Sequence, residues 1–143
     1  MSGDTRTIHA SCVAIEGHGL LICGGSGAGK TALLVELLRR GAQFVADDGV
    51  VISQKEGRIW ASSAKGNKGL IGISPGVVAV FADVFPDAKS TQEALVGLCV
   101  MLEGETEQGS KGLLADIPKL NLERGELTSM ADICERTVIS LIA

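Results

Sequence analysis

The chain has 143 residues, the size of one ordinary domain, and its 45% hydrophobic and 21% charged residues are typical of a globular protein. A net charge of −4, one tryptophan and no tyrosine provide neither the basic surface nor the stacking rings of nucleic-acid-binding proteins, so we expect no nucleic-acid partner. Its apolar runs are too short to cross a bilayer and its first residues lack a secretory signal, so we expect a cytoplasmic protein without a membrane partner.

The N-terminal third is predicted to form a hairpin followed by a helix. Residues 7–15 are rich in β-branched and apolar side chains, and a glycine-containing turn at 16–19 leads into an apolar strand at 20–23. Beyond the glycine-rich segment that follows, leucines recur at helical spacing, and Gly41 stands where a C-terminal cap is expected. We therefore predict one short helix that ends at Gly41.

The middle of the chain is predicted to be dominated by strands, with an exposed loop at residues 61–69. The two lysines of this loop, Lys65 and Lys68, are either solvated or contact phosphate. The predicted strands cover residues 44–46, 50–52, 58–60, 70–73, 77–81 and 94–102, and the segments at 82–93 and 104–111 are predicted to be irregular.

A final amphipathic helix is predicted to begin after Ser129, whose hydroxyl can cap its first turn. Its apolar stripe is predicted to pack in the core and consists of Met130, Ile133, Cys134, Thr137, Val138, Leu141 and Ile142. Because the chain has no internal repeat, we predict a single α/β domain, rich in strands, over residues 1–143.

The four cysteines are predicted to be free and buried. They lie in apolar stretches, and none forms a C-x-x-C pair of the kind that zinc sites and redox motifs use. These cysteines are Cys12, Cys23, Cys99 and Cys134.

The glycine-rich segment matches the phosphate-binding pattern G-x-x-x-x-G-K-[ST], known as the P-loop or Walker A motif. It follows an apolar strand and opens a helix, so backbone N–H groups and the helix N-terminus would converge on one anion. Lys30 can reach the β and γ phosphates, and the Thr31 hydroxyl can bind Mg²⁺. The alternative is a glycine-rich turn that happens to precede Lys-Thr. The motif predicts that ATP is bound by Gly24, Gly25, Ser26, Gly27, Ala28, Gly29, Lys30 and Thr31.

Two acidic residues, Asp47 and Asp48, follow the predicted strand at 44–46. We expect this strand to lie beside the strand that carries the glycine loop. A carboxylate there can bind Mg²⁺ or its water, as we expect of Asp47, or accept a proton. The alternative is that Asp48 and Gly49 form a hairpin turn between two apolar strands. His9, on the first predicted strand, is either a structural residue or part of the site.

Residues 9–50 resemble the catalytic domain of HPr kinase/phosphorylase, the bacterial enzyme that phosphorylates a serine of the phosphocarrier HPr. The resemblance covers His9, Gly-His-Gly-Leu-Leu-Ile at 17–22, the glycine loop, Glu-Leu-Leu-Arg-Arg-Gly at 36–41 and Val-Ala-Asp-Asp at 45–48, without a gap. It implies a fold similar to the nucleotide-binding core of phosphoenolpyruvate carboxykinase.

The resemblance also implies a function. The chain would transfer the γ-phosphoryl group of ATP, with Mg²⁺, to a serine of HPr or a related protein, in the regulation of carbon metabolism or in a phosphorelay. Lys30 would act on the phosphates, Thr31 on Mg²⁺, Asp48 as the base and His9 as a further catalytic residue. The family also forms homo-oligomers, so by analogy this chain would as well.

The sequence departs from the family at three places. Ala32 stands where the family has an acidic residue, and Gly-Ile-Ser-Pro at 72–75 aligns with a Glu-Ile-Arg-Gly signature whose glutamate helps to hold Mg²⁺. The family's N-terminal domain and part of its C-terminal region, including a catalytic arginine, are also missing. We therefore keep two further hypotheses open, an ATP-binding regulatory module without phosphoryl transfer and a small-molecule kinase or simple NTPase.

Overall fold

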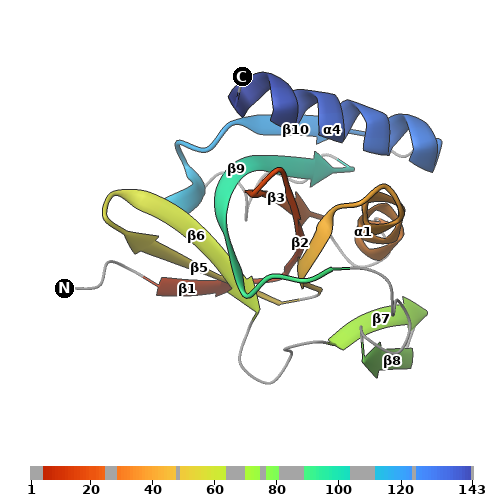
Figure 1. Cartoon of the computed structure of the whole chain (residues 1–143), viewed down its shortest axis with the longest axis horizontal. Coiled ribbons are helices and arrows are strands. Elements are labelled where there is room, and N and C mark those ends of the chain that lie inside the picture. The colour runs from red at the N-terminus through yellow and green to blue at the C-terminus, as the bar shows by residue number, and fades with distance from the viewer. Residues whose placement is uncertain are drawn as a thin grey trace.

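The computed structural model describes residues 5–24, 29–47, 49–63, 70–74, 77–80, 89–103, 112–123 and 125–142, with the backbone alone for 70–74 and 77–80. The chain forms a strand-rich mixed α/β fold, as predicted, in which α1 and α4 cover one face of a curved sheet (Figure 1). The strands are β1 (Thr5–Ile8), β2 (Ala10–Ile15), β3 (His18–Cys23), β4 (Gln43–Ala46), β5 (Val50–Lys55), β6 (Arg58–Ser63), β7 (Leu70–Ser74), β8 (Val77–Val80), β9 (Glu93–Leu102) and β10 (Lys119–Leu122). The helices of the described residues are α1 (Lys30–Arg39), the short 3-10 helix η1 (Gly112–Leu114) and α4 (Leu127–Ile142).

The main sheet has eight strands in the order β1-β5-β6-β9-β3-β2-β4, with β10 also paired to β9. The predicted hairpin of β2 and β3 is confirmed, with Ile15 opposite His18. The expectation that β4 lies beside β3 is wrong, because β2 occupies that edge of β3 and pairs with β4 on its other side. Strands β4 and β5 do not pair with each other as a hairpin, since β4 pairs with β2 whereas β5 pairs with β1 and β6.

Two other boundaries differ from the sequence prediction. The first predicted strand breaks at His9, so that β1 pairs with β5 while β2 pairs with β3. Strand β6 continues to Ser63, where an exposed loop was expected, because its last residues pair with β5 and β9. Lys65 and Lys68 lie outside the described residues.

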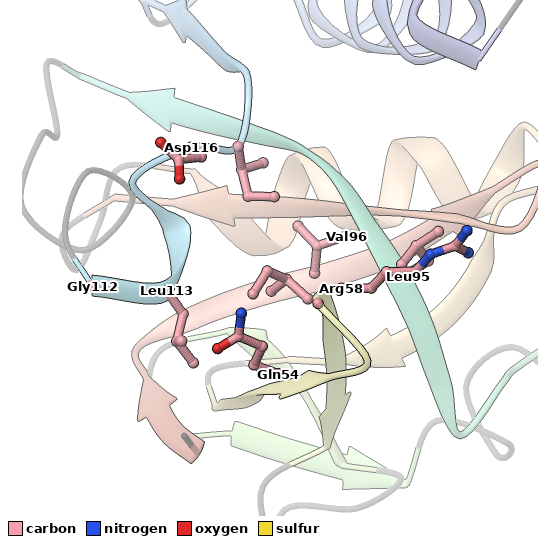
Figure 2. Close-up of a pocket in the computed structure, with 10 residues that line it drawn as sticks. Gln54, Arg58, Leu95, Val96, Gly112, Leu113 and Asp116 are labelled. Carbon is pink, nitrogen blue, oxygen red and sulfur yellow. The ribbon is translucent and has the colours of Figure 1, made fainter. Parts of the chain in front are cut away.

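Strands β6 and β10 share the same edge of β9, because β3 occupies the other edge. β6 pairs with β9 at Leu95, and β10 pairs with it from Cys99 onward. A cavity of about 480 Å³ opens in this fork, and Figure 2 shows it between the β5–β6 hairpin and the segment that contains η1. Its lining residues are Gln54, Gly57, Arg58, Ile59, Leu95, Val96, Gly112, Leu113, Asp116 and Ile117.

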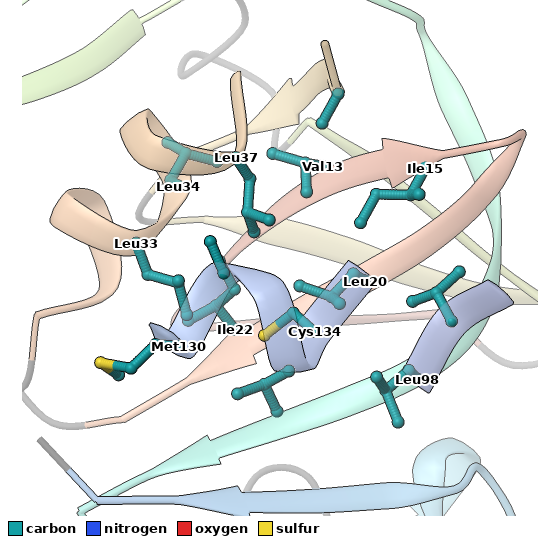
Figure 3. Close-up of a cluster of buried hydrophobic side chains, with 14 of the residues drawn as sticks. Val13, Ile15, Leu20, Ile22, Leu33, Leu34, Leu37, Leu98, Met130 and Cys134 are labelled. Carbon is teal, nitrogen blue, oxygen red and sulfur yellow. The ribbon is translucent and has the colours of Figure 1, made fainter. Parts of the chain in front are cut away.

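Helices α1 and α4 cover one face of β2, β3 and β9. Alternate residues of the three strands, such as Val13, Leu20 and Leu98, point toward leucines of α1 and toward Met130 and Cys134 of α4 (Figure 3). The opposite face packs against β5, β6 and η1 in a second cluster. Each strand therefore buries both faces, which agrees with the continuous apolar runs in β2 and β3.

Helix α1 ends as predicted, with Gly41 at a φ of 103° that favours glycine. Helix α4 begins at Leu127, so Ser129 lies within its first turn and does not cap it. The Met130 N–H already donates to the Glu126 carbonyl at 3.0 Å, which closes a helical turn before Ser129 could act. The predicted stripe is only partly buried, since Ile133, Leu141 and Ile142 are exposed. None of the described helices is long and apolar enough to span a membrane.

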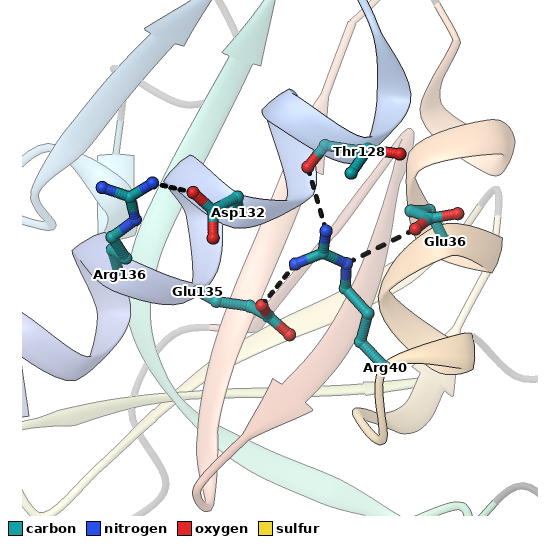
Figure 4. Close-up of polar contacts among 6 residues, drawn as sticks. All are labelled: Glu36, Arg40, Thr128, Asp132, Glu135 and Arg136. Atoms are coloured by element: carbon teal, nitrogen blue, oxygen red, sulfur yellow. Dashed lines mark hydrogen bonds and ion pairs between the residues drawn. The ribbon is translucent and has the colours of Figure 1, made fainter.

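Arg40 joins the two long helices at the end of α1. Its guanidinium donates to Glu36 of α1 at 3.4 Å, to Glu135 of α4 at 2.7 Å and to the Thr128 carbonyl at 3.1 Å (Figure 4). The hydrogen bond to Glu135 raises the pKa of Arg40, so the charge persists throughout the physiological range. The side chain therefore fixes α4 against the helix that follows the glycine loop.

We predict that Arg40→Ala lowers the Tm on the order of 5 °C, because it removes polar contacts between two helices. Arg136→Ala is the matched control. Arg136 pairs with Asp132 on the exposed side of α4, and exposed ion pairs contribute little to stability. Differential scanning calorimetry of both variants tests the prediction, and equal losses would contradict it.

The four cysteines are free and buried, as the sequence predicts. Burial raises the pKa of the Cys99 thiol to about 11 and that of Cys134 to about 12, and it also raises the pKa of Cys12. At pH 8 these thiols therefore carry far less of the reactive thiolate than an exposed cysteine does.

We predict that native protein at pH 8 reacts with iodoacetamide at Cys99 and Cys134 roughly 100-fold or more slowly than protein unfolded in guanidinium. Peptide mass spectrometry after a timed quench measures both rates. If either residue is alkylated rapidly in protein whose Tm and circular dichroism spectrum are those of the native state, the described packing is wrong.

Candidate functional site

The predicted phosphate loop joins the end of β3 to the start of α1. Cys23 ends β3, Gly24 follows it, and Gly29 precedes the helix with a φ of 97° and a ψ of 19°. This left-handed conformation suits glycine and strains other residues. Gly29 has no side chain that could cap the first turn of α1, which contains Lys30 and Thr31. The residues between them, Gly25, Ser26, Gly27 and Ala28, lie outside the described residues, so their contacts with phosphate stay a prediction.

Lys30 is a buried charge at the start of α1. Its side chain is 8% exposed, and its ammonium donates to the Gly24 carbonyl at 2.9 Å. The same Nζ lies 3.4 Å from Nε2 of the exposed His9. Because an ammonium only donates, this contact requires an imidazole with its proton on Nδ1. The two predicted residues His9 and Lys30 are thus brought together beside the loop.

Thr31 and Asp47 also meet. The Thr31 hydroxyl lies 3.2 Å from Oδ1 and 3.4 Å from Oδ2 of Asp47, although β4 is two strands away from β3. The contact is possible because Asp47 directly follows β4, at the same end of the sheet from which β3 enters the loop. Both predicted metal ligands therefore lie at one point. Asp48, the predicted base, lies outside the described residues.

Ser11 belongs to the same cluster, although sequence reasoning did not single it out. Its hydroxyl donates to Asp47 Oδ1 at 2.6 Å, and its side chain is fully buried. Among the described residues the buried polar side chains are Ser11, Lys30 and Asp47, and all three lie at this end of the sheet. One signal was available, because a serine inside a strand that is otherwise apolar must find a hydrogen-bond partner.

The donor set of Thr31 and Asp47 fits Mg²⁺. Both offer hard oxygen ligands, and Mg²⁺ is usually bound through one or two carboxylates together with phosphate oxygens and water. Within the described part of the chain, no three His, Cys, Asp or Glu side chains gather as a metal site. A complete shell at Thr31 and Asp47 would therefore depend on oxygens from the nucleotide and the solvent.

The residues that the sequence resemblance aligns with a metal-binding signature lie outside the main sheet. Gly72 and Ser74 belong to β7, which pairs with β8 in a two-stranded sheet beside α1. The cavity in the fork of β6 and β10 is at the far end of β9, since its Leu95 pairs with His18 whereas Met101 pairs with Cys23. Among the described residues of the predicted site, none lines that cavity.

Comparison with known proteins identifies HPr kinases as relatives. The model of the HPr serine kinase C-terminal domain family matches residues 2–137. The HPr kinase/phosphorylase of Brevibacillus brevis is 47% identical over 60 residues, 42% of this chain and 19% of that protein. The HPr kinase/phosphorylase of Streptococcus thermophilus is 35% identical over 102 residues, 70% of this chain and 33% of that protein. The match thus spans a third or less of the length of these relatives.

A solved structure has the same fold. The Hpr(Ser) kinase/phosphatase of Coxiella burnetii superposes with a TM-score of 0.74 at 23% sequence identity, and the match covers 94% of this chain and 89% of that one. Together with the match of the family model over nearly the whole sequence, this agreement identifies the protein family. The chain belongs to the HPr serine kinase C-terminal domain family.

Proposed function

We propose that this chain is an ATP-dependent serine protein kinase of the HPr kinase type, which transfers the γ-phosphoryl group of Mg²⁺·ATP to a serine of HPr or a related phosphocarrier. The observation that carries the proposal is the contact of Thr31 with Asp47 at 3.2 Å, next in sequence to the buried Lys30, whose ammonium donates to the Gly24 carbonyl at the start of the loop. Membership of the HPr serine kinase family supports the same class of reaction.

The hydrogen bonds of the site suggest how each residue would act. Thr31 has one proton, and because it donates this proton to Asp47, its lone pairs remain available to a cation. Mg²⁺ held there would neutralise charge on the phosphate oxygens. Lys30, whose ammonium lies at the entrance of the loop, would neutralise charge on the β and γ phosphates.

Asp48 would complete the reaction as the general base. Its carboxylate would accept the proton of the serine hydroxyl as the serine oxygen bonds to the γ phosphorus and the bond to the bridging oxygen of ADP breaks. Asp48 is adjacent in sequence to Asp47, so the base would stand next to the residue that binds the cation. His9, 3.4 Å from Lys30, would help to place the ammonium.

A second function is favoured by a specific observation. By the resemblance described in the sequence analysis, Gly72 and Ser74 align with a metal-binding glutamate and an arginine, and Ala32 aligns with an acidic residue. Transfer depends strongly on charge neutralisation, whereas nucleotide binding depends mainly on the loop and Lys30. The second candidate is therefore a regulatory module that binds ATP without transferring its phosphoryl group.

Both candidates require ATP binding through Lys30. We predict that Lys30→Ala weakens binding by about 1.5–3 kcal/mol, roughly 10- to 150-fold in Kd, because a charge-assisted contact is lost. Lys55→Ala is the matched control, since Lys55 pairs with Glu93 and lies 5.2 Å from the Trp60 ring at the far end of β5. Titration calorimetry with Mg²⁺·ATP measures both. An unchanged Kd in folded Lys30→Ala would show that this loop is not the phosphate site.

The two candidates differ at Asp48. If the chain is a kinase, Asp48→Asn should slow transfer to HPr roughly 10²- to 10⁴-fold, the usual contribution of a general base, while the Kd for ATP changes much less. Asp116→Asn removes an exposed carboxylate beside the distant cavity and should leave the rate unchanged. The assay is incubation with Mg²⁺·ATP and purified HPr, followed by mass spectrometry for phosphoserine.

The wild-type result of this assay decides between the candidates. Transfer to serine supports the kinase. ATP binding without transfer, together with an ATP-dependent change in Tm or in association with a partner, supports the regulatory module.

A further inference from the structure

We infer that Ser11 is a positioning residue for the Mg²⁺ site, because its hydroxyl holds the Asp47 carboxylate in the orientation that it needs beside Thr31. The inference rests on the proposed function, since it concerns the same site. It adds a residue that neither the motif nor the family resemblance includes.

The contact is short, charged and shielded from solvent. Ser11 Oγ donates to Asp47 Oδ1 at 2.6 Å, with exposed fractions of 0% for Ser11 and 4% for Asp47. An O–H···O⁻ bond of this length is among the stronger hydrogen bonds in proteins. Water competes little for either group, so the carboxylate orientation is set by protein donors.

The donor itself is rigidly held. Ser11 lies in β2, where it pairs with Ile22 of β3 on one side. On the other side Cys12 pairs with Ala46 of β4, so the antiparallel register places Ser11 across from Asp47, the residue after Ala46. Ser11 is therefore fixed by strands on both sides, and its hydroxyl contacts Asp47 from a neighbouring strand of the sheet.

Two donors act on the same carboxylate oxygen. Oδ1 accepts from Ser11 at 2.6 Å and from Thr31 at 3.2 Å, and these donors come from β2 and α1. Bonds from two directions restrict rotation of the carboxylate plane. Because the Asp47 carboxylate is already oriented, less free energy is lost in ordering it when the cation binds. Ser11 should therefore strengthen Mg²⁺ binding without contacting the cation.

A purely structural role for Ser11 is the competing explanation, because a buried carboxylate needs hydrogen bonds in any case. Both explanations predict some loss of stability in Ser11→Ala. Only the positioning role predicts a change in Mg²⁺ dependence. Ser63→Ala provides a matched control. The Ser63 hydroxyl also donates a hydrogen bond of 2.6 Å to β4, but its acceptor is the Val45 carbonyl and not a carboxylate.

The test is titration calorimetry with a non-hydrolysable ATP analogue, first in EDTA and then over a series of Mg²⁺ concentrations. We expect wild-type protein and both variants to bind the analogue equally in EDTA. In Ser11→Ala the Mg²⁺ concentration for the half-maximal gain in affinity should rise about 3- to 10-fold, as expected for the loss of one hydrogen bond to a ligand. In Ser63→Ala it should stay at the wild-type value, although we expect the Tm to fall in both variants.

An unchanged Mg²⁺ midpoint in folded Ser11→Ala, or an equal shift in Ser63→Ala, would overturn the positioning role. If Ser11→Ala does not fold, Ser11→Cys decides, because a thiol fills the site but donates weakly and should raise the midpoint in the same direction. A wild-type protein that binds the analogue with no Mg²⁺ dependence would overturn the proposed metal site and this inference together. If only the positioning role is wrong, wild-type protein still depends on Mg²⁺, and the Ser11 variants keep the wild-type midpoint.

Discussion

Burial of the Asp47 carboxylate is the constraint on which the arrangement of the site depends. An ionised group that is removed from water is strongly destabilising unless hydrogen bonds replace its hydration. Asp47 receives these bonds from Ser11 on β2 and from Thr31 on α1. Helix α1 is thereby fixed to the ends of two strands, and Lys30, the residue before Thr31, is held against Gly24 where β3 leaves the sheet.

Much of the fold follows from local patterns that the sequence displays. The β2–β3 hairpin, helix α1 with Gly41 at its end, and most strands could be predicted because each depends on neighbouring residues. The order of strands could not be predicted in the same way. The hairpin places β2 between β3 and β4, and only long-range pairing determines which edge of β3 is available to β4.

The candidate site shows the same division. The glycine pattern names Lys30 and Thr31, and the acidic pair after β4 names Asp47, because each belongs to a short motif. Ser11 has no motif of its own, and its role arises from a cross-strand register that needs the sheet to be known. Ser129 was expected at a helix start because local chemistry allows it, yet the helix begins at Leu127, where packing of Met130 and Ala131 already holds the chain.

The topology also bears on how nucleotide binding and phosphoryl transfer could be separated in the proposed function. The contacts of Asp47, Thr31 and Lys30 involve β2, β3, β4 and α1 of the main sheet and its covering helix. Gly72 and Ser74 instead belong to the two-stranded sheet of β7 and β8. Gly72 and Ser74 thus lie outside the strands and the helix that supply the hydrogen bonds around Asp47. In the proposed function, nucleotide binding and transfer would then depend on different parts of the fold, so affinity and rate must be measured separately.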